Sequence, residues 1–137
     1  MKRHYAVVLA CLLTASGTGC AYNAKPAHHV QHRKVHHLVI VWLKQAGDEN
    51  ARQHYIQESE GLAKLPGVLA YDVGTPASIN RGRPNAALDE SYDVAVSSVY
   101  ESQQAYEGFL QNPDYLRVAQ QVLRPLVDKY KVYDFIE

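Results

Sequence analysis

The strongest constraint on how this chain folds is a run of six consecutive apolar residues, LVIVWL, from Leu38 to Leu43. A run this short and this rich in β-branched residues predicts a β-strand with both faces buried, rather than a helix. Because side chains alternate along a strand, the run presents three apolar side chains to each face. One face receives Val39, Val41 and Leu43, and the other receives Leu38, Ile40 and Trp42. Both faces of the sheet that contains this strand therefore need an apolar cover.

Composition sets the scale of the protein and excludes one class of partner. The chain has 137 residues, of which 47% are apolar and 20% charged, enough for one small domain with a core. Its formal net charge is zero, and without Lys2 and Arg3 it holds 12 basic and 14 acidic residues, a net charge of −2. Neither balance provides the basic stripe that neutralises phosphates, so no nucleic-acid partner is expected.

Residues 1–19 have the layout of an export signal. Lys2 and Arg3 precede ten residues of mostly apolar character, Ala6 to Ala15, and small residues follow up to Gly19. Ten residues are too few to span a bilayer, which needs about twenty. The segment is therefore predicted to be a cleaved, lipoprotein-type signal peptide.

Cys20 indicates how the mature protein is held. Cys11 falls within the predicted signal peptide, so Cys20 would be the sole cysteine and no disulfide could form within the domain. The run that ends at Cys20 resembles the lipobox of bacterial lipoproteins, although Gly17 stands where leucine is usual. This resemblance implies a lipidated Cys20 and a protein anchored at the periplasmic face of a bacterial membrane, where multiple acyl chains give stable attachment. The alternative is a soluble periplasmic or secreted protein cleaved near Ala21 or Ala24.

Residues 20–35 are predicted to form a histidine-rich tether, because they lack a hydrophobic period. His28, His32 and His36 recur every four residues, so a helix would align them as ligands for a transition metal. No cysteine or carboxylate is interleaved, and Pro26 disfavours a helix. The main interpretation is a solvated linker that gains charge in mild acid, with metal binding as the alternative.

The domain is expected over residues 36–137. Strands are predicted at 36–44, 68–74, 92–100 and 132–136. Helices are predicted after three N-cap residues, Asp48, Ser102 and Asn112, the last of these helices carrying an apolar stripe as far as Leu126. A long loop, 75–91, contains Arg81 and Arg83, which are either solvated or meet an anionic ligand.

The element order β-α-β-β-α-α-β predicts an α+β, ferredoxin-like fold with a four-stranded antiparallel sheet. Right-handed crossovers place all the helices on one face. The opposite face, with Leu38, Ile40 and Trp42 or their alternates, is too apolar for a monomer. Two sheets packed face to face, about 10 Å apart, would bury it, so a homodimer is expected.

Five stretches lie in the order and spacing of a known family: HHLVIVWLK, LPGVLAYDVG, YDVAVSSVYES, NPDY and VYDF. Together they resemble the stress-responsive A/B barrel domain (Dabb) family over residues 36–136. The resemblance implies a dimeric α+β barrel, and most members of the family have no established reaction. One plant branch resembles a polyketide cyclase whose histidine and tyrosine correspond to Tyr115 and Phe109 here. Since both side chains differ, that chemistry is not carried over.

His37 and Asp134 match family positions on the first and last strands and are expected to approach each other. A carboxylate would fix the tautomer of His37 as a general base, and Tyr115, with Tyr55, could donate a hydrogen bond nearby. The alternative is a structural pair without chemistry.

The sequence therefore predicts an apolar pocket between sheet and helices, which binds a small hydrophobic molecule. Its wall is expected to include Val39, Val41, Tyr55 and Phe109. The first hypothesis is a stress-related binding module, and the second is a cofactor-independent lyase or cyclase acting through His37 and Asp134. No cofactor is predicted, and the metal-binding tether is the third hypothesis.

Overall fold

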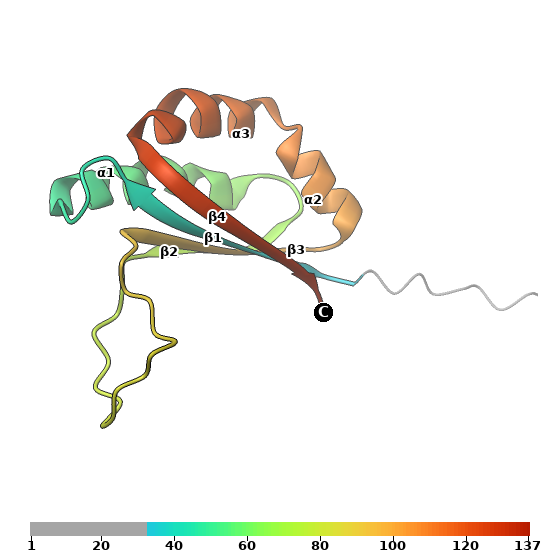
Figure 1. The fold of residues 1–137 in the computed structure, drawn as a ribbon. Helices are drawn as coiled ribbons and strands as arrows, with labels where there is room; N and C mark the ends of the chain where they lie inside the picture. Colours follow the sequence, from blue (N-terminus) through green and yellow to red (C-terminus); the bar gives the residue numbers. More distant parts are fainter. Residues whose placement is uncertain (1–32) are drawn as a thin grey trace, which may run out of the picture.

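The computed structural model describes residues 33–137, so the predicted signal peptide, the predicted lipidation site Cys20, and His28 and His32 lie outside the described residues. Figure 1 shows a sheet covered on one side by helices. The strands are β1 (Val35–Leu43), β2 (Val68–Gly74), β3 (Val94–Tyr100) and β4 (Val127–Ile136). The α-helices are α1 (Glu49–Ser59), α2 (Gln103–Leu110) and α3 (Pro113–Arg117). Three further helical turns are η1 (Glu60–Lys64), η2 (Val118–Leu123) and η3 (Arg124–Leu126).

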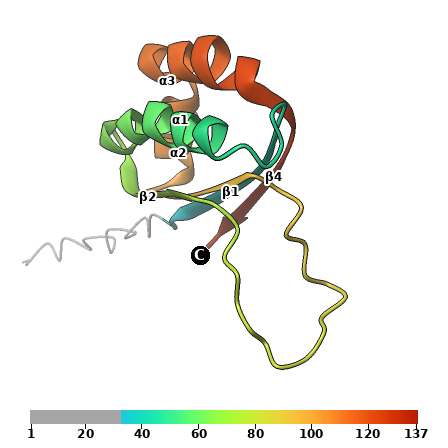
Figure 2. The ribbon, with the colours of Figure 1, turned by 90° about the vertical axis from the view of Figure 1, so that its left-hand side faces the viewer.

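The sheet has the order β2-β3-β1-β4, and all neighbouring strands are antiparallel. Figures 1 and 2 show the helices above one face, while no helix or strand within residues 33–137 covers the other face, called here the open face. The predicted ferredoxin-like α+β fold is therefore confirmed. Within residues 33–137, no helix has the length and apolar character needed to cross a membrane.

The alternation predicted for the first strand decides which side chains enter the core. Val41 and Leu43 are buried beneath the helices, at 1% and 3% exposure. They pack there with residues such as Val94 and Phe109. Leu38, Ile40 and Trp42, called here the Leu38 set, lie on the open face. This is the face for which a second apolar cover was expected.

The three predicted N-caps are present. The side chain of Asp48 accepts a hydrogen bond from the Ala51 N–H at 2.7 Å, and Ser102 accepts one from Ala105 at 3.1 Å. Asn112 caps α3 by accepting from the N–H groups of the two residues that follow Pro113. Each cap satisfies donors that the first helical turn leaves without a partner.

The last helix and the last strand differ from the prediction. The helix that begins at Pro113 does not continue regularly to Leu126: it becomes a π-helix over η2 and a 3₁₀ turn over η3. Pro125 in η3 has no N–H for an α-helical bond, which is one reason for the irregular end. The strand that follows begins at Val127, five residues before the predicted start, because it pairs with the whole of β1.

Two strand details also differ. The strand predicted at 68–74 would, by regular alternation, place Leu69 on one face with Tyr71 and Val73. The register between β2 and β3 shifts between Val68 and Ala70, and Leu69 is 52% exposed. The bulge explains this departure, since one extra residue reverses the alternation.

Asp93 is buried just before β3, where the prediction had placed it inside the strand. Its carboxylate accepts hydrogen bonds from the N–H groups of Leu43 at 2.8 Å and Gly47 at 2.7 Å. The Arg52 guanidinium donates to it at 3.0 Å. Burial alone would raise the pKa of Asp93, but these three donors hold that pKa below its ordinary value. Asp93 thus ties β1, the following turn and α1 to the start of β3.

Candidate functional site

A cavity of about 370 Å³ lies between the helix-facing side of the sheet and the helices. All four residues predicted for the pocket wall line it, and so does Tyr115. Val39 and Val41 come from β1, the central strand, whereas Tyr55 comes from α1 and Phe109 from α2. The cavity size falls within the usual range for small-molecule sites.

Tyrosine dominates the polar part of the wall. Six tyrosines line the cavity: Tyr55, Tyr71, Tyr100, Tyr106, Tyr115 and Tyr130. Burial raises the pKa of Tyr55 and of Tyr100 to about 12, and it also raises the pKa of Tyr71, Tyr106 and Tyr115. These five phenols therefore stay protonated near neutral pH and present O–H donors to the cavity.

His37 and Asp134 meet at one end of the cavity. They lie opposite each other on β1 and β4, and the His37 Nδ1 atom is 2.6 Å from Asp134 Oδ1. When Nδ1 carries the proton it donates to this carboxylate, and Nε2 is left with a free lone pair. The side chain of His37 is 14% exposed and that of Asp134 is 46% exposed, so solvent reaches the carboxylate more than the imidazole.

Tyr106 is the third member of this group, and the sequence analysis missed it. Its hydroxyl oxygen is 2.8 Å from His37 Nδ1. Burial raises the pKa of Tyr106, and the negative charge of Asp134 raises it further. Tyr106 follows the Ser102 cap by four residues and precedes Phe109 by three, so helical spacing already placed it on the sheet-facing side of α2. Nothing in the sequence indicated that this face ends above His37.

Tyr115 forms no hydrogen bond with the His37–Asp134 pair, whose side-chain hydrogen bonds within residues 33–137 are with each other and with Tyr106. The Tyr115 ring packs on Phe109, with centroids 4.6 Å apart, and Phe109 in turn packs on Tyr100 at 5.0 Å. The row of rings continues to Tyr106 at 4.6 Å from Tyr100. The hydroxyl that contacts the pair is therefore that of Tyr106.

The arrangement proposed for a metal-binding helix is wrong. His36 lies in β1, where its ring stacks on Phe135 with centroids 4.6 Å apart and its Nε2 is 3.3 Å from a Glu137 carboxylate oxygen. A residue in a strand cannot share a helical face with His28 and His32. Within residues 33–137, no group of three or more His, Cys, Asp or Glu side chains is placed to hold a metal ion.

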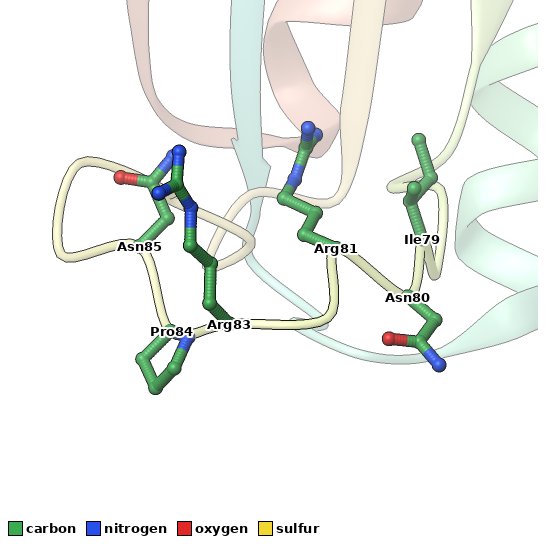
Figure 3. Close-up of a pocket in the computed structure, with 6 residues that line it drawn as sticks. All are labelled: Ile79, Asn80, Arg81, Arg83, Pro84 and Asn85. Atoms are coloured by element: carbon green, nitrogen blue, oxygen red, sulfur yellow. The ribbon is translucent and has the colours of Figure 1, made fainter.

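Arg81 and Arg83 lie in the long loop, far from the cavity just described. Figure 3 shows both side chains projecting from the same side of this loop. They border a second hollow of about 690 Å³, whose walls all come from residues 79–85. Because every one of these lining residues is exposed and no other element contributes a wall, the hollow is a surface feature of the loop.

Comparisons with known proteins place the fold. Among solved structures, a Dabb family protein with a ferredoxin-like fold from Mesorhizobium loti has a TM-score of 0.63 and 20% identity, covering 77% of this chain and 98% of that one. A dimeric ferredoxin-like protein of unknown function from Thermobifida fusca has a TM-score of 0.60 and 18% identity, with coverages of 78% and 93%. The hydroxynitrile lyase of Passiflora edulis has a TM-score of 0.60 and 19% identity, with coverages of 76% and 93%. At these identities the likeness concerns the fold alone.

The sequence comparisons identify the family. No curated protein sequence matches the chain. The family model described as Stress responsive A/B Barrel Domain, Dabb, matches residues 35–137, which include every strand, every helix and the whole wall of the cavity. The chain therefore belongs to the stress-responsive A/B barrel domain family.

Proposed function

We propose that this protein is an exported, lipid-anchored homodimer that binds a small hydrophobic molecule in the cavity between sheet and helices. The observation that carries the ligand-binding part of this proposal is the 370 Å³ cavity itself. Valine, leucine and aromatic side chains make most of its wall, and a small polar group, His37 with Tyr106, marks one end. Apolar walls with a few convergent polar groups are typical of small-molecule sites.

The direct test is to identify what the folded protein carries. Native mass spectrometry of the purified protein should show an added mass, which denaturation releases as a small apolar compound. The substitution Ala119→Trp would fill the cavity, because Ala119 lines it, and should abolish the added mass. Ala87→Trp, in the exposed loop, is the matched control and should leave the mass in place. A folded protein with neither a co-purified compound nor affinity for apolar probes would contradict the proposal.

The contact between His37 and Asp134 supports a second candidate function, a cofactor-independent lyase or cyclase. The carboxylate would hold the tautomer in which His37 Nε2 accepts a proton, and Tyr106 would donate a hydrogen bond to developing negative charge. One protein with a similar fold, from Passiflora edulis, is named as a hydroxynitrile lyase. That resemblance suggests one reaction class to try first.

The two candidates separate on the His37→Ala variant. If the protein is a binding module, the His37→Ala variant should keep most of the wild-type affinity for an apolar probe, and neither protein should release cyanide. In a lyase, release of cyanide from an aromatic hydroxynitrile should fall by about 10² to 10⁴-fold, the usual contribution of a general base. Asp134→Asn should lower the rate in the same direction, because the tautomer is then no longer fixed.

The homodimer is proposed because the open face of the sheet is apolar. Tyr133 and Phe135 of β4 are 52% and 58% exposed there, next to the Leu38 set of β1. Proteins of similar fold from Thermobifida fusca and Bacteroides fragilis are described as dimeric. Two such faces packed together would remove this area from water.

The membrane anchor is proposed from the residues around Cys20. Expressed in a bacterium, the full chain should partition with membranes, and the mature protein should carry the mass of attached acyl chains. Cys20→Ser should release it into the soluble fraction, while Cys11→Ser should not. A Cys20→Ser variant that stays with the membrane would contradict lipidation.

A further inference from the structure

We propose that the molecule bound in the cavity is an amphipathic acid whose carboxylate pairs with Arg124 at the cavity mouth. This inference rests on the proposed binding function and names the chemical class of the ligand. The apolar body of the acid would lie along β1, and its far end would reach the His37–Tyr106 group.

The charge of the cavity wall favours an anion. Arg124 is the lining residue with a permanent charge, His37 is the other basic group, and none of the lining residues is Asp or Glu. The nearest carboxylate identified above, Asp134, is already engaged by His37. An anionic ligand would therefore meet a cation and phenol donors in this wall, and no opposing charge.

The guanidinium group of Arg124 has N–H donors available for a ligand. One guanidinium nitrogen, Nη1, donates to the carbonyl oxygen of Val127 at 2.9 Å, and the group lies 5.8 Å from the ring centroid of Tyr130. Among the ion pairs within 4.0 Å in residues 33–137, none involves Arg124. A guanidinium has five N–H donors and matches the planar, two-oxygen geometry of a carboxylate. The Val127 contact orients the group and leaves the other donors for a ligand.

The position of Arg124 separates it from the polar group at His37. Tyr130, beside the guanidinium, pairs with Val41, whereas Asp134 pairs with His37. These pairs are four residues apart along the strands, which is roughly 13 Å. Arg124 and Tyr130 are exposed, so this end of the wall opens to solvent. An amphipathic acid fits this arrangement, with its charged headgroup at the exposed Arg124 end and its apolar body against the apolar wall inside.

The backbone before Arg124 is also unusual. Residues Val118–Leu123 form a π-helix, a rare conformation that often occurs at functional sites. Ala119, Gln120 and Leu123 from this segment line the cavity, and Arg124 follows directly. The wider turn thus forms part of the wall and ends at the residue proposed to bind the headgroup.

The test uses two probes of nearly the same shape, 1-naphthylacetate and its uncharged amide, 1-naphthylacetamide, titrated calorimetrically into the full-length protein. The wild-type protein should bind the acid about tenfold more tightly than the amide, the lower end for a hydrogen bond to a charged group. Arg124→Gln should remove this preference by weakening the acid alone, and Arg124→Lys should retain part of it. Arg117→Gln, which removes an exposed cation outside the wall, is the matched control and should change neither affinity.

The outcomes distinguish this inference from the proposed function. If both probes bind equally, or if the acid preference survives in Arg124→Gln, the headgroup assignment is overturned while ligand binding stands. If the Arg117→Gln control loses the preference for the acid to the same extent, the preference reflects overall charge, and the headgroup assignment is again overturned. If neither probe binds the folded wild-type protein, the headgroup assignment is overturned, and if no compound co-purifies with it either, the proposed binding function fails as well.

Discussion

Two aspartates, Asp93 just before β3 and Asp134 in β4, show how the same side chain acquires different roles from its surroundings. Asp93 is 1% exposed, and its carboxylate accepts hydrogen bonds from N–H groups of Leu43, Gly47 and Arg52. It therefore stabilises the fold by joining β1 and α1 to the start of β3. Asp134 is half-exposed on an edge strand and its carboxylate meets His37 at the end of a cavity. Burial with several fixed donors is typical of a structural carboxylate, whereas a solvent-accessible one beside an imidazole is available for chemistry.

The substitution Asp93→Asn should lower the free energy of unfolding by about 2 kcal/mol, because it removes the charge that balances Arg52 and weakens the bonds from two buried N–H groups. The pKa of Asp93 is lowered in the folded protein. Its stabilisation is therefore complete above the unfolded-state pKa of about 3.9 and is lost as the pH falls through the lower folded-state value. Urea unfolding should show a constant difference between wild type and variant from neutral pH down to about pH 5, narrowing in stronger acid. Asp128→Asn, on the exposed part of β4, is the control, and an equal loss there would contradict a specific role for Asp93.

The buried tyrosines predict a loss of stability in alkali. The pKa of Tyr55 and that of Tyr100 are raised to about 12 in the folded protein, mainly by burial. A raised folded-state pKa contributes stability that is complete below the unfolded value of about 10 and is lost as the pH rises through the folded value. The free energy of unfolding should therefore fall between about pH 10 and about pH 12. Tyr55→Phe should make this fall less steep, and an unchanged slope in that variant would contradict the assignment.

At the scale of elements, irregular segments make the cavity. A regular α-helix from Pro113 to Leu126 was expected, but the observed segment passes through a π-helix whose residues line the cavity. On the other side, β4 extends as far as Val127 and carries both Asp134 and the exposed Tyr130. The regular strands and helices supply the core residues, whereas the irregular segments supply part of the candidate site.

Gly67 is the element junction where a single methyl group should matter most. It precedes β2 with a φ of +82°, and a Cβ atom there would lie 2.8 Å from the Cβ of Ala105 in α2. Gly67→Ala should therefore incur both the left-handed backbone penalty and a clash, for a total loss of about 2 to 4 kcal/mol. Gly82→Ala, at a φ of +69° with no atom within 4 Å of the added Cβ, should incur only the backbone penalty. Thermal unfolding of both variants measures the difference, and equal losses would contradict the predicted clash.

At the scale of the whole molecule, the described residues, 33–137, cover the sheet on one face only (Figures 1 and 2). The open face carries the apolar side chains of β1 and the exposed rings of β4. The lysine stems of Lys129 and Lys131 shield part of Trp42, with their Nζ atoms 4.9 and 5.8 Å from its ring centroid. These two stems cover much less of the open face than a second sheet would, because a packed sheet would bury the face along its whole length.

Ile40→Glu should separate the proposed dimer into subunits, because it places a charge at the centre of the open face, where a partner would otherwise exclude water. Analytical ultracentrifugation at micromolar concentration should show a dimer for the wild type and a folded monomer for the variant. Leu116→Glu, an exposed apolar residue on α3, is the control and should remain dimeric. A wild-type protein that sediments as a stable monomer would contradict the proposal.

The sequence alone determined the order of the elements, three helix caps and the two faces of the first strand, because these depend on spacing along the chain. Only the tertiary structure decided that Tyr106 reaches His37, that Arg124 lies at the cavity mouth and that Asp93 fastens the fold. Those contacts join residues that are 69 and 50 positions apart, as for Tyr106 with His37 and Asp93 with Leu43. Spacing along a helix or strand fixes the direction of a side chain relative to its own element. What that side chain meets depends on strand register, bulges and helix irregularities, which local patterns do not encode.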